Sequence, residues 1–203
     1  MLRCLIISCL FTLSTAVFCQ EKSFVPHIFG GLSTSQVDGD SYGGYDKAGL
    51  LLGIGVERRI TTKWSWNLDL QYAQKGSVKR ADTQNGDFTQ FKISLGYIEA
   101  PIQIHYHWNN FSLFAGISGG SLIHFKEFDS NGERNNPVAF NRFELAGLGG
   151  IRYLFGSMFF AEICLGNSLL SVRDINENNR NTHLRSGNFN RWIYTKIAYR
   201  FGS

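Results

Sequence analysis

The stretch that most constrains this chain's fold is Gly96–His107, which reads G-Y-I-E-A-P-I-Q-I-H-Y-H. Its apolar residues fall at every second position, and the positions between them are mostly polar or charged. A period of two indicates a β-strand with one apolar and one polar face. About ten residues are also enough to cross a bilayer when the strand is tilted. We therefore expect a transmembrane strand whose apolar face meets lipid and whose polar face lines a closed barrel.

The same alternation recurs along the rest of the chain, which is rich in glycine and aromatic residues and poor in proline. Such a composition suits an antiparallel all-β domain. We expect eight strands in total, at His27–Leu32, Ala48–Arg58, Trp64–Tyr72, Gly96–His107, Phe111–His124, Asn141–Leu154, Met158–Asn167 and Arg191–Phe201.

The connections between these segments alternate regularly between long and short. The short ones have about three to five residues and the long ones about fourteen to nineteen, as in outer-membrane barrels with short periplasmic turns and long extracellular loops. With eight strands and both termini on one side, the long connections all fall outside. The predicted fold is therefore an all-β, eight-stranded antiparallel up-and-down transmembrane β-barrel with four long extracellular loops.

The N-terminus carries the pattern of an export signal. One arginine precedes an apolar run that is too short to span a membrane as a helix, and small and polar residues follow it. We expect residues 1–19 to be a cleaved signal peptide and residues 20–203 to be the barrel domain, located in the cell outer membrane. Cys19 invites a lipoprotein interpretation, but the preceding Phe18 does not fit one. Cys164 is expected to be a small strand residue.

Charged residues lie on the polar faces of otherwise apolar strands. An eight-stranded barrel has an interior just wide enough to be filled by side chains, so general porin activity is not expected. Unpaired charge would be costly there, and carboxylates should meet basic groups. The candidates for the barrel interior are Glu57, Asp69, Glu99, Glu144, Arg152, Glu162, Lys196 and Arg200.

Aromatic residues gather near the strand ends, where they would form girdles at the two membrane surfaces. The residues assigned to these girdles are Trp64, Trp66, Tyr72, Tyr97, Tyr106, Trp108, Phe111, Tyr153, Phe155, Phe159, Trp192 and Tyr199.

Three features could be sites, and each also has a structural interpretation. Pro101 inside a strand indicates a bulge or bend, or an irregularity that re-aims Glu99 into the lumen. His105 and His107 could bind a metal if a third ligand converged, but the sequence shows no accompanying ligand cluster. The buried glutamates could act in acid–base chemistry, although ion pairing explains them better. We expect no catalytic residue, no cofactor and no metal site.

Two motifs resemble the PorT-like outer-membrane β-barrel family of Bacteroidetes: Gln71–Gly76, which reads Q-Y-A-Q-K-G, and Tyr97–Ile102, which reads Y-I-E-A-P-I. Phe114–Gly116 and the terminal Tyr199–Phe201 also fit, whereas Ala100 replaces a larger aliphatic residue. The resemblance places Lys75 and its neighbours in a turn after a strand. It implies a small closed barrel in a Gram-negative envelope and no reaction, and one branch of the family takes part in protein secretion. The motif residues are Gln74, Lys75, Gly76, Tyr97, Glu99 and Pro101.

The predicted function is a structural, binding or envelope-assembly role without catalysis, carried out by a monomeric barrel. Its expected partners are outer-membrane lipid and envelope or secretion-system proteins. Nucleic acid is not expected, because the net charge is only +4 and the basic residues are scattered. Three alternatives stay open: an accessory subunit of a secretion machine, a soluble lipocalin-type barrel with an apolar interior, and a membrane-embedded enzyme acting on lipid.

Overall fold

A computed structural model describes residues 24–38, 47–79, 89–130, 132–134, 140–173 and 188–202. The predicted signal peptide lies outside these residues. The described residues form nine strands: β1 (Phe24–Asp38), β2 (Lys47–Arg59), β3 (Trp64–Lys79), β4 (Phe91–Trp108), β5 (Phe111–Asp129), β6 (Gly132–Glu133), β7 (Phe143–Phe155), β8 (Phe159–Ser168) and β9 (Phe189–Arg200). None of the described residues belongs to a helix that is long and apolar enough to span a membrane.

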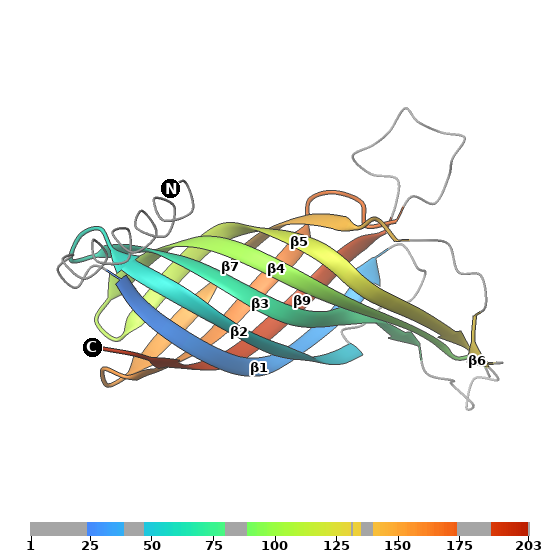
Figure 1. The fold of residues 1–203 in the computed structure, drawn as a ribbon, viewed down its shortest axis with the longest axis horizontal. Helices are drawn as coiled ribbons and strands as arrows, with labels where there is room; N and C mark the ends of the chain where they lie inside the picture. Colours follow the sequence, from blue (N-terminus) through green and yellow to red (C-terminus); the bar gives the residue numbers. More distant parts are fainter. Residues whose placement is uncertain are drawn as a thin grey trace, which may run out of the picture.

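All strand pairs are antiparallel, and the sheet closes on itself (Figure 1). Neighbours in sequence are neighbours in the sheet, except that β1 pairs with β9 and β5 pairs with β7. The two-residue β6 only extends the end of β5. The result is the predicted eight-stranded up-and-down barrel. Its described short turns, residues 60–63, 109–110 and 156–158, all lie at one end, which is the periplasmic end in outer-membrane barrels.

The apolar face of each strand points outward, as predicted. Ile54, Leu113 and Ile163 are 58%, 59% and 56% exposed, whereas the polar Asp69 and Glu99 on the inner face are 1% and 2% exposed. This arrangement is the reverse of a lipocalin-type barrel, which would turn its apolar side chains toward an internal ligand. A barrel whose outward face is apolar is stable when lipid and not water surrounds it.

Several strands are longer than the sequence predicted. β1 runs through residues 33–38, which were expected to be loop because Ser, Thr and Gln dominate them. Ser33 donates a hydrogen bond to the Gln74 carbonyl, and the Ser35 hydroxyl donates to the Gly76 carbonyl at 3.1 Å. Gly76 was expected to end a strand in a turn, but it lies inside β3 and pairs with Ser94. Outward positions in these stretches, such as Thr34, Gln36 and Gln74, are also polar, so the apolar period that marks the other strands is lost.

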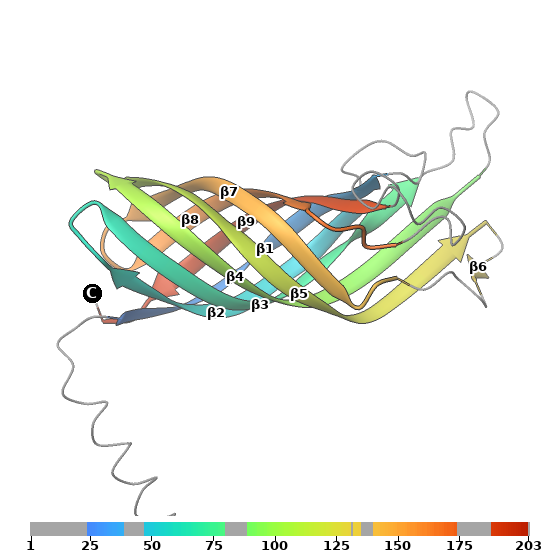
Figure 2. The same cartoon turned by 90° about the horizontal axis from the view of Figure 1, so that it is seen from above.

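The wall is not of uniform height. The pairing of β5 with β7 ends at Ser121 and Phe143, whereas β4 and β5 continue together to the pair Phe91 and Asp129. We call residues 76–79 of β3, 91–96 of β4 and 124–129 of β5 the extracellular extension. Figure 1 and Figure 2 show β4, β5 and β6 projecting beyond the neighbouring strands at the end opposite the short turns.

An irregularity between Gly96 and Tyr97 shifts the β4–β5 register and leaves Ile123 without a partner. Beyond it the two faces of β5 are exchanged, so that Glu127 turns inward. Pro101 does not shift the register: the β3–β4 pairing stops at Leu68–Ile102 and resumes at Gln71–Glu99 with the same offset. Glu99 faces the lumen in ordinary alternation and needs no proline to re-aim it.

Gly76 gives a test of the extension's backbone. Its φ of +141° is strained for other residues, and an added Cβ would lie 2.1 Å from the Ile93 carbonyl oxygen. We expect Gly76→Ala to destabilise the folded barrel by about 1–3 kcal/mol. The measurement is the folded, faster-migrating band on unheated gels across a urea series. Gly119→Ala is the control, because its Cβ would meet only the Phe143 ring at 3.7 Å. Equal stability of the two variants would contradict this register.

Candidate functional site

The lumen is the candidate site, because ionisable side chains from most strands converge there. Two groups of ion pairs occupy the middle of the lumen. One, which we call the outer cluster, centres on Lys75, and the other, the inner cluster, centres on Arg152 and Lys196. Strand alternation places every member on the inner face, where side chains from opposite walls can meet.

The outer cluster joins β3, β4 and β7. Lys75 Nζ lies 2.5 Å from Glu99 Oε1 and 2.7 Å from Glu144 Oε2. The amide groups of neighbouring side chains donate to the remaining carboxylate oxygens, Gln71 to Glu99 at 2.7 Å and Asn190 to Glu144 at 3.1 Å. One lysine therefore serves two buried carboxylates, with amide donors completing their hydrogen bonding.

Aromatic rings cover the same lysine. Lys75 Nζ lies 4.9 Å from the centre of the Trp192 ring and 5.0 Å from that of Tyr97, which are distances typical of cation–π contacts. Trp192 stacks on Tyr194 with ring centres 4.0 Å apart. Trp192 and Tyr97 were predicted to lie in the membrane girdles, and that assignment is wrong: they are 2% and 0% exposed. Their inward phase could be read in sequence, because Trp192 lies four residues before Lys196 and Tyr97 two before Glu99.

The inner cluster also crosses the barrel. Arg152 of β7 lies 2.8 Å from Glu57 of β2 and 2.9 Å from Glu162 of β8. Lys196 of β9 lies 2.9 Å from Glu162 and 2.8 Å from Asp69 of β3. Because β2 and β7 are not neighbours in the sheet, the Arg152–Glu57 pair bridges opposite sides of the lumen.

Histidines extend the inner cluster. His27 Nε2 lies 2.9 Å from Asp69 Oδ1 across Gly55, where an added Cβ would lie 2.1 Å from that oxygen. His107 lies 2.7 Å from both Ser65 Oγ and Ser112 Oγ. The Ser65–His107 pair resembles half of a hydrolytic site, but Ser65 is buried, with 0% of its surface exposed.

His105 contacts Gln103 at 3.0 Å. Within the described ranges, no group of three histidine, cysteine or acidic side chains is placed to hold a metal ion.

The structure buries seven of the predicted interior residues in these clusters: Glu57, Asp69, Glu99, Glu144, Arg152, Glu162 and Lys196. Arg200, the eighth, is only half-buried, and its guanidinium lies 3.5 Å from the Ser157 carbonyl of the last short turn. Sequence reasoning missed the lumen positions of Glu127 and Asn190, because both lie in stretches expected to be loops or loop borders. Lys75 was noted only as part of a family motif.

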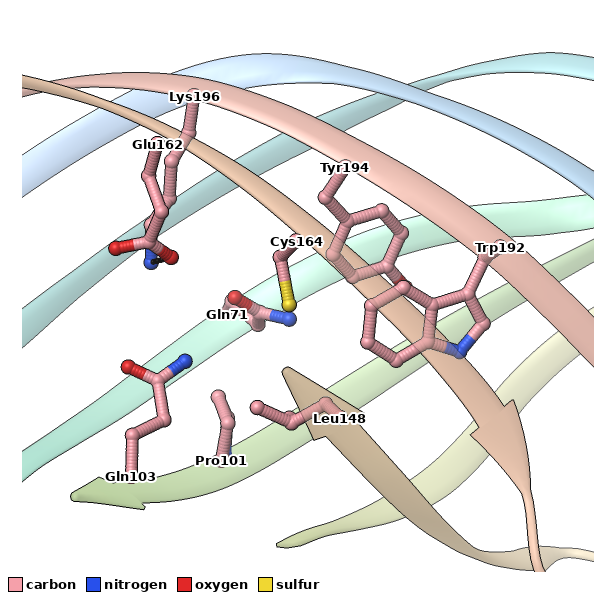
Figure 3. A pocket seen from close by; sticks show the side chains of 9 residues that line it. All are labelled: Gln71, Pro101, Gln103, Leu148, Glu162, Cys164, Trp192, Tyr194 and Lys196. Carbon is pink, nitrogen blue, oxygen red and sulfur yellow. Dashed lines mark ion pairs between the residues drawn. The ribbon is translucent and has the colours of Figure 1, made fainter. Parts of the chain in front are cut away.

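Paired charges and aromatic rings of the described residues occupy the middle of the lumen. A cavity of about 10 Å³ lies between the clusters, lined by Gln71, Pro101, Gln103, Leu148, Glu162, Cys164, Trp192, Tyr194 and Lys196 (Figure 3). That volume is about the size of one water molecule.

Toward the extracellular end, an apolar group fills the lumen: Val37, Ile93, Leu95, Tyr97, Phe140 and Val172. Beside it, Glu127 is held by Arg173 at 2.6 Å and Arg134 at 3.5 Å.

Comparison with known proteins agrees with this geometry. Residues 18–172 match the profile of the outer membrane protein beta-barrel domain family. The chain belongs to this family. The protein is therefore an outer-membrane barrel, and its apolar outer wall faces membrane lipid. No curated protein matches the chain in sequence.

Solved outer-membrane barrels are similar in shape at low identity. Ail, the attachment invasion locus protein of Yersinia pestis, is 14% identical with a TM-score of 0.52, over 88% of this chain and 99% of that one. Neisserial surface protein A is 12% identical with a TM-score of 0.47, over 88% and 97%. OprG from Pseudomonas aeruginosa is 10% identical with a TM-score of 0.45, over 91% and 98%. The likeness to Ail shows the shared fold alone.

Lys75 tests the outer cluster. Replacing it by methionine leaves Glu99 and Glu144 buried without a counter-charge, which should destabilise the barrel by about 3–5 kcal/mol. Urea unfolding of the protein reconstituted in lipid vesicles measures this loss. Adding Glu99→Gln and Glu144→Gln should restore most of the stability, because the uncompensated charges are then removed.

Lys126→Met is the matched control for this experiment, because Lys126 pairs with Glu133 on the surface at 3.2 Å and such pairs contribute about 0–1 kcal/mol. Equal stability of K75M and K126M would contradict the outer cluster.

Proposed function

We propose that this protein is a non-catalytic, monomeric barrel that anchors a binding surface outside the cell. The observation that carries the proposal is the combination of a filled lumen with a wall that rises on one side only. Paired charges and an apolar group occupy the lumen among the described residues, which supports a role without solute transport or catalysis. The wall formed by β3, β4 and β5 continues past the other strands, and it is this part of the described protein that reaches farthest outward.

The extension has the properties of a rigid platform. On its inner side, Ile93 and Leu95 pack in the apolar group, and Glu127 is fixed by Arg173. On its outer side, Lys92 and Lys126 are exposed. A surface whose inner side is fixed by packing loses little conformational freedom on binding, which favours affinity. We infer that the extension contacts another envelope protein, and that the role is one of binding or assembly.

The narrower assignment to the PorT-like family is also a proposal, and the positions of the motif residues support it. Lys75 and Glu99, from two separate motifs, form the shortest ion pair of the outer cluster, and the Tyr97 ring covers the same lysine. Gly76 provides the positive φ next to Lys75, and Pro101 lines the small cavity. The two motifs thus supply one charged cluster inside the barrel, which agrees with a family fold signature that encodes no reaction.

A conductance measurement tests the filled lumen. In a planar lipid bilayer, the folded protein should produce no conductance steps above the lipid baseline, because the paired charges and the apolar group occupy the pore. A general porin inserted in the same bilayer provides the positive control. Regular single-channel steps from the wild-type protein would overturn the proposal that its lumen is structural.

Photo-crosslinking tests the binding surface. A photoreactive amino acid replaces Lys92 or Lys126 on the extension and, as a control, Ile163, which is 56% exposed on the lipid-facing wall of β8. In intact cells, positions 92 and 126 should yield a discrete protein adduct, and position 163 should yield none. Absence of protein adducts at both extension positions, or an equal adduct at position 163, would overturn the proposal.

A further inference from the structure

The lipid-facing wall is not uniformly smooth. A groove of about 570 Å³ runs across β1, β2, β3 and β4 on the outer surface. Its sides are apolar residues such as Ile28, Ile54 and Leu70, which are 48%, 58% and 52% exposed. The small side chain of Ala100 on β4 lines the groove beside Leu70, and Phe201 closes it near the C-terminus. In Figure 1, β1, β2 and β3 lie side by side on the near face.

An arginine lies on the same outer face at the periplasmic end of this groove. Arg58 is two residues beyond the groove residue Val56, so the two side chains are separated by about 7 Å along β2. Its strand partners are Phe24 of β1 and Trp66 of β3. The guanidinium lies 5.1 Å from the centre of the Phe24 ring, which also makes an edge contact with Trp66 at 5.8 Å.

The charge of Arg58 is not neutralised within the part of the protein that the structure describes, where no carboxylate pairs with it. Lys63 follows in the adjacent short turn, and Arg59 ends β2. The acidic Glu57 points into the lumen and pairs with Arg152. A lipid-facing arginine is costly at the bilayer centre and nearly free at the interface. Arg58 therefore lies at headgroup depth, directly below an apolar groove that enters the hydrocarbon region.

We propose that this face holds one anionic phospholipid of the inner leaflet, with its phosphate on Arg58 and an acyl chain in the groove. The guanidinium offers donors in the fork geometry that suits phosphate oxygens, and Phe24 and Trp66 limit its rotation. Lys63, in the adjacent short turn, adds positive charge, which favours an anionic over a zwitterionic headgroup. The proposal does not depend on the function proposed for the extracellular extension.

The outer wall of the barrel offers a control for this site. A second groove of about 320 Å³ lies on β5, β7 and β8, lined by residues such as Ile151, Ala161 and Ile163. The adjacent short turn, residues 155–158, reads F-G-S-M and contains no charged residue. Arg200, whose guanidinium lies 3.5 Å from the Ser157 carbonyl of this turn, is in phase with the inward-facing residues of β9. The second groove therefore matches the first in apolar character, but its own wall carries no outward-facing cation at the periplasmic end. It should therefore take up lipid without headgroup selectivity.

Native mass spectrometry of the purified barrel in detergent, titrated with phosphatidylglycerol, tests the site. The wild-type protein should retain one phosphatidylglycerol in preference to phosphatidylcholine. Arg58→Gln should weaken that binding by about tenfold, the size expected for a charge-assisted hydrogen bond. Ala100→Leu should weaken it by occluding the groove, Arg58→Lys should keep part of it through the remaining charge, and Ala161→Leu in the control groove should leave it unchanged.

Folding of each variant is checked by heat-modifiable gel migration, and inorganic phosphate alone serves as a competitor. Wild-type binding in R58Q and A100L, or equal weakening in A161L, would overturn the proposal. Displacement of the lipid by inorganic phosphate would overturn the role of the groove. A barrel dimer that A100L disrupts, in place of a lipid adduct, would show that a second copy occupies the groove and would also overturn it.

Discussion

The structure depends on the pairing of charges inside a lumen that shields them from bulk water. Lys75 and Arg152 each contact two carboxylates from different strands, at distances of 2.5–2.9 Å. Removing one member of such a set leaves a buried charge without compensation, which costs far more than an exposed pair contributes. The network is therefore stable only when all of its charged residues are present. It also links strands that backbone hydrogen bonds do not join, such as β2 and β7.

The outer wall follows the opposite rule. Residues that alternate with the charged ones are aliphatic or aromatic and are about half exposed, which an aqueous surrounding would not tolerate over so large an area. Because lipid surrounds the wall, the places where its surface is charged or grooved indicate where the contact with lipid changes. Arg58 marks headgroup depth, and the groove beside it marks a place where lipid contact is specific. The extension, at the other end, leaves the membrane altogether.

The sequence allowed the fold to be predicted because a period of two is a local signal and loop lengths are visible directly. It also indicated which charged residues turn inward, since Glu99, Glu162 and Lys196 each alternate with apolar neighbours. It failed where the signal was not local. The partner of Lys75 on β7 depends on how the barrel closes, and the unpaired Ile123 depends on the register between two strands. Trp192 and Tyr97 were wrongly predicted to lie in the membrane girdles, because that prediction relied on their being aromatic. Both occupy inward-facing positions in the alternation of their strands.

The most direct test of a filled lumen is the reactivity of Cys164, the one cysteine among the described residues, which is 4% exposed and lines the small cavity. The folded protein in lipid vesicles is treated with a small charged thiol reagent, and modification at Cys164 is followed by peptide mass spectrometry. We expect no modification while the barrel stays folded and complete modification after urea unfolding. Rapid modification of Cys164 in the folded barrel would show an open aqueous lumen and would contradict this account.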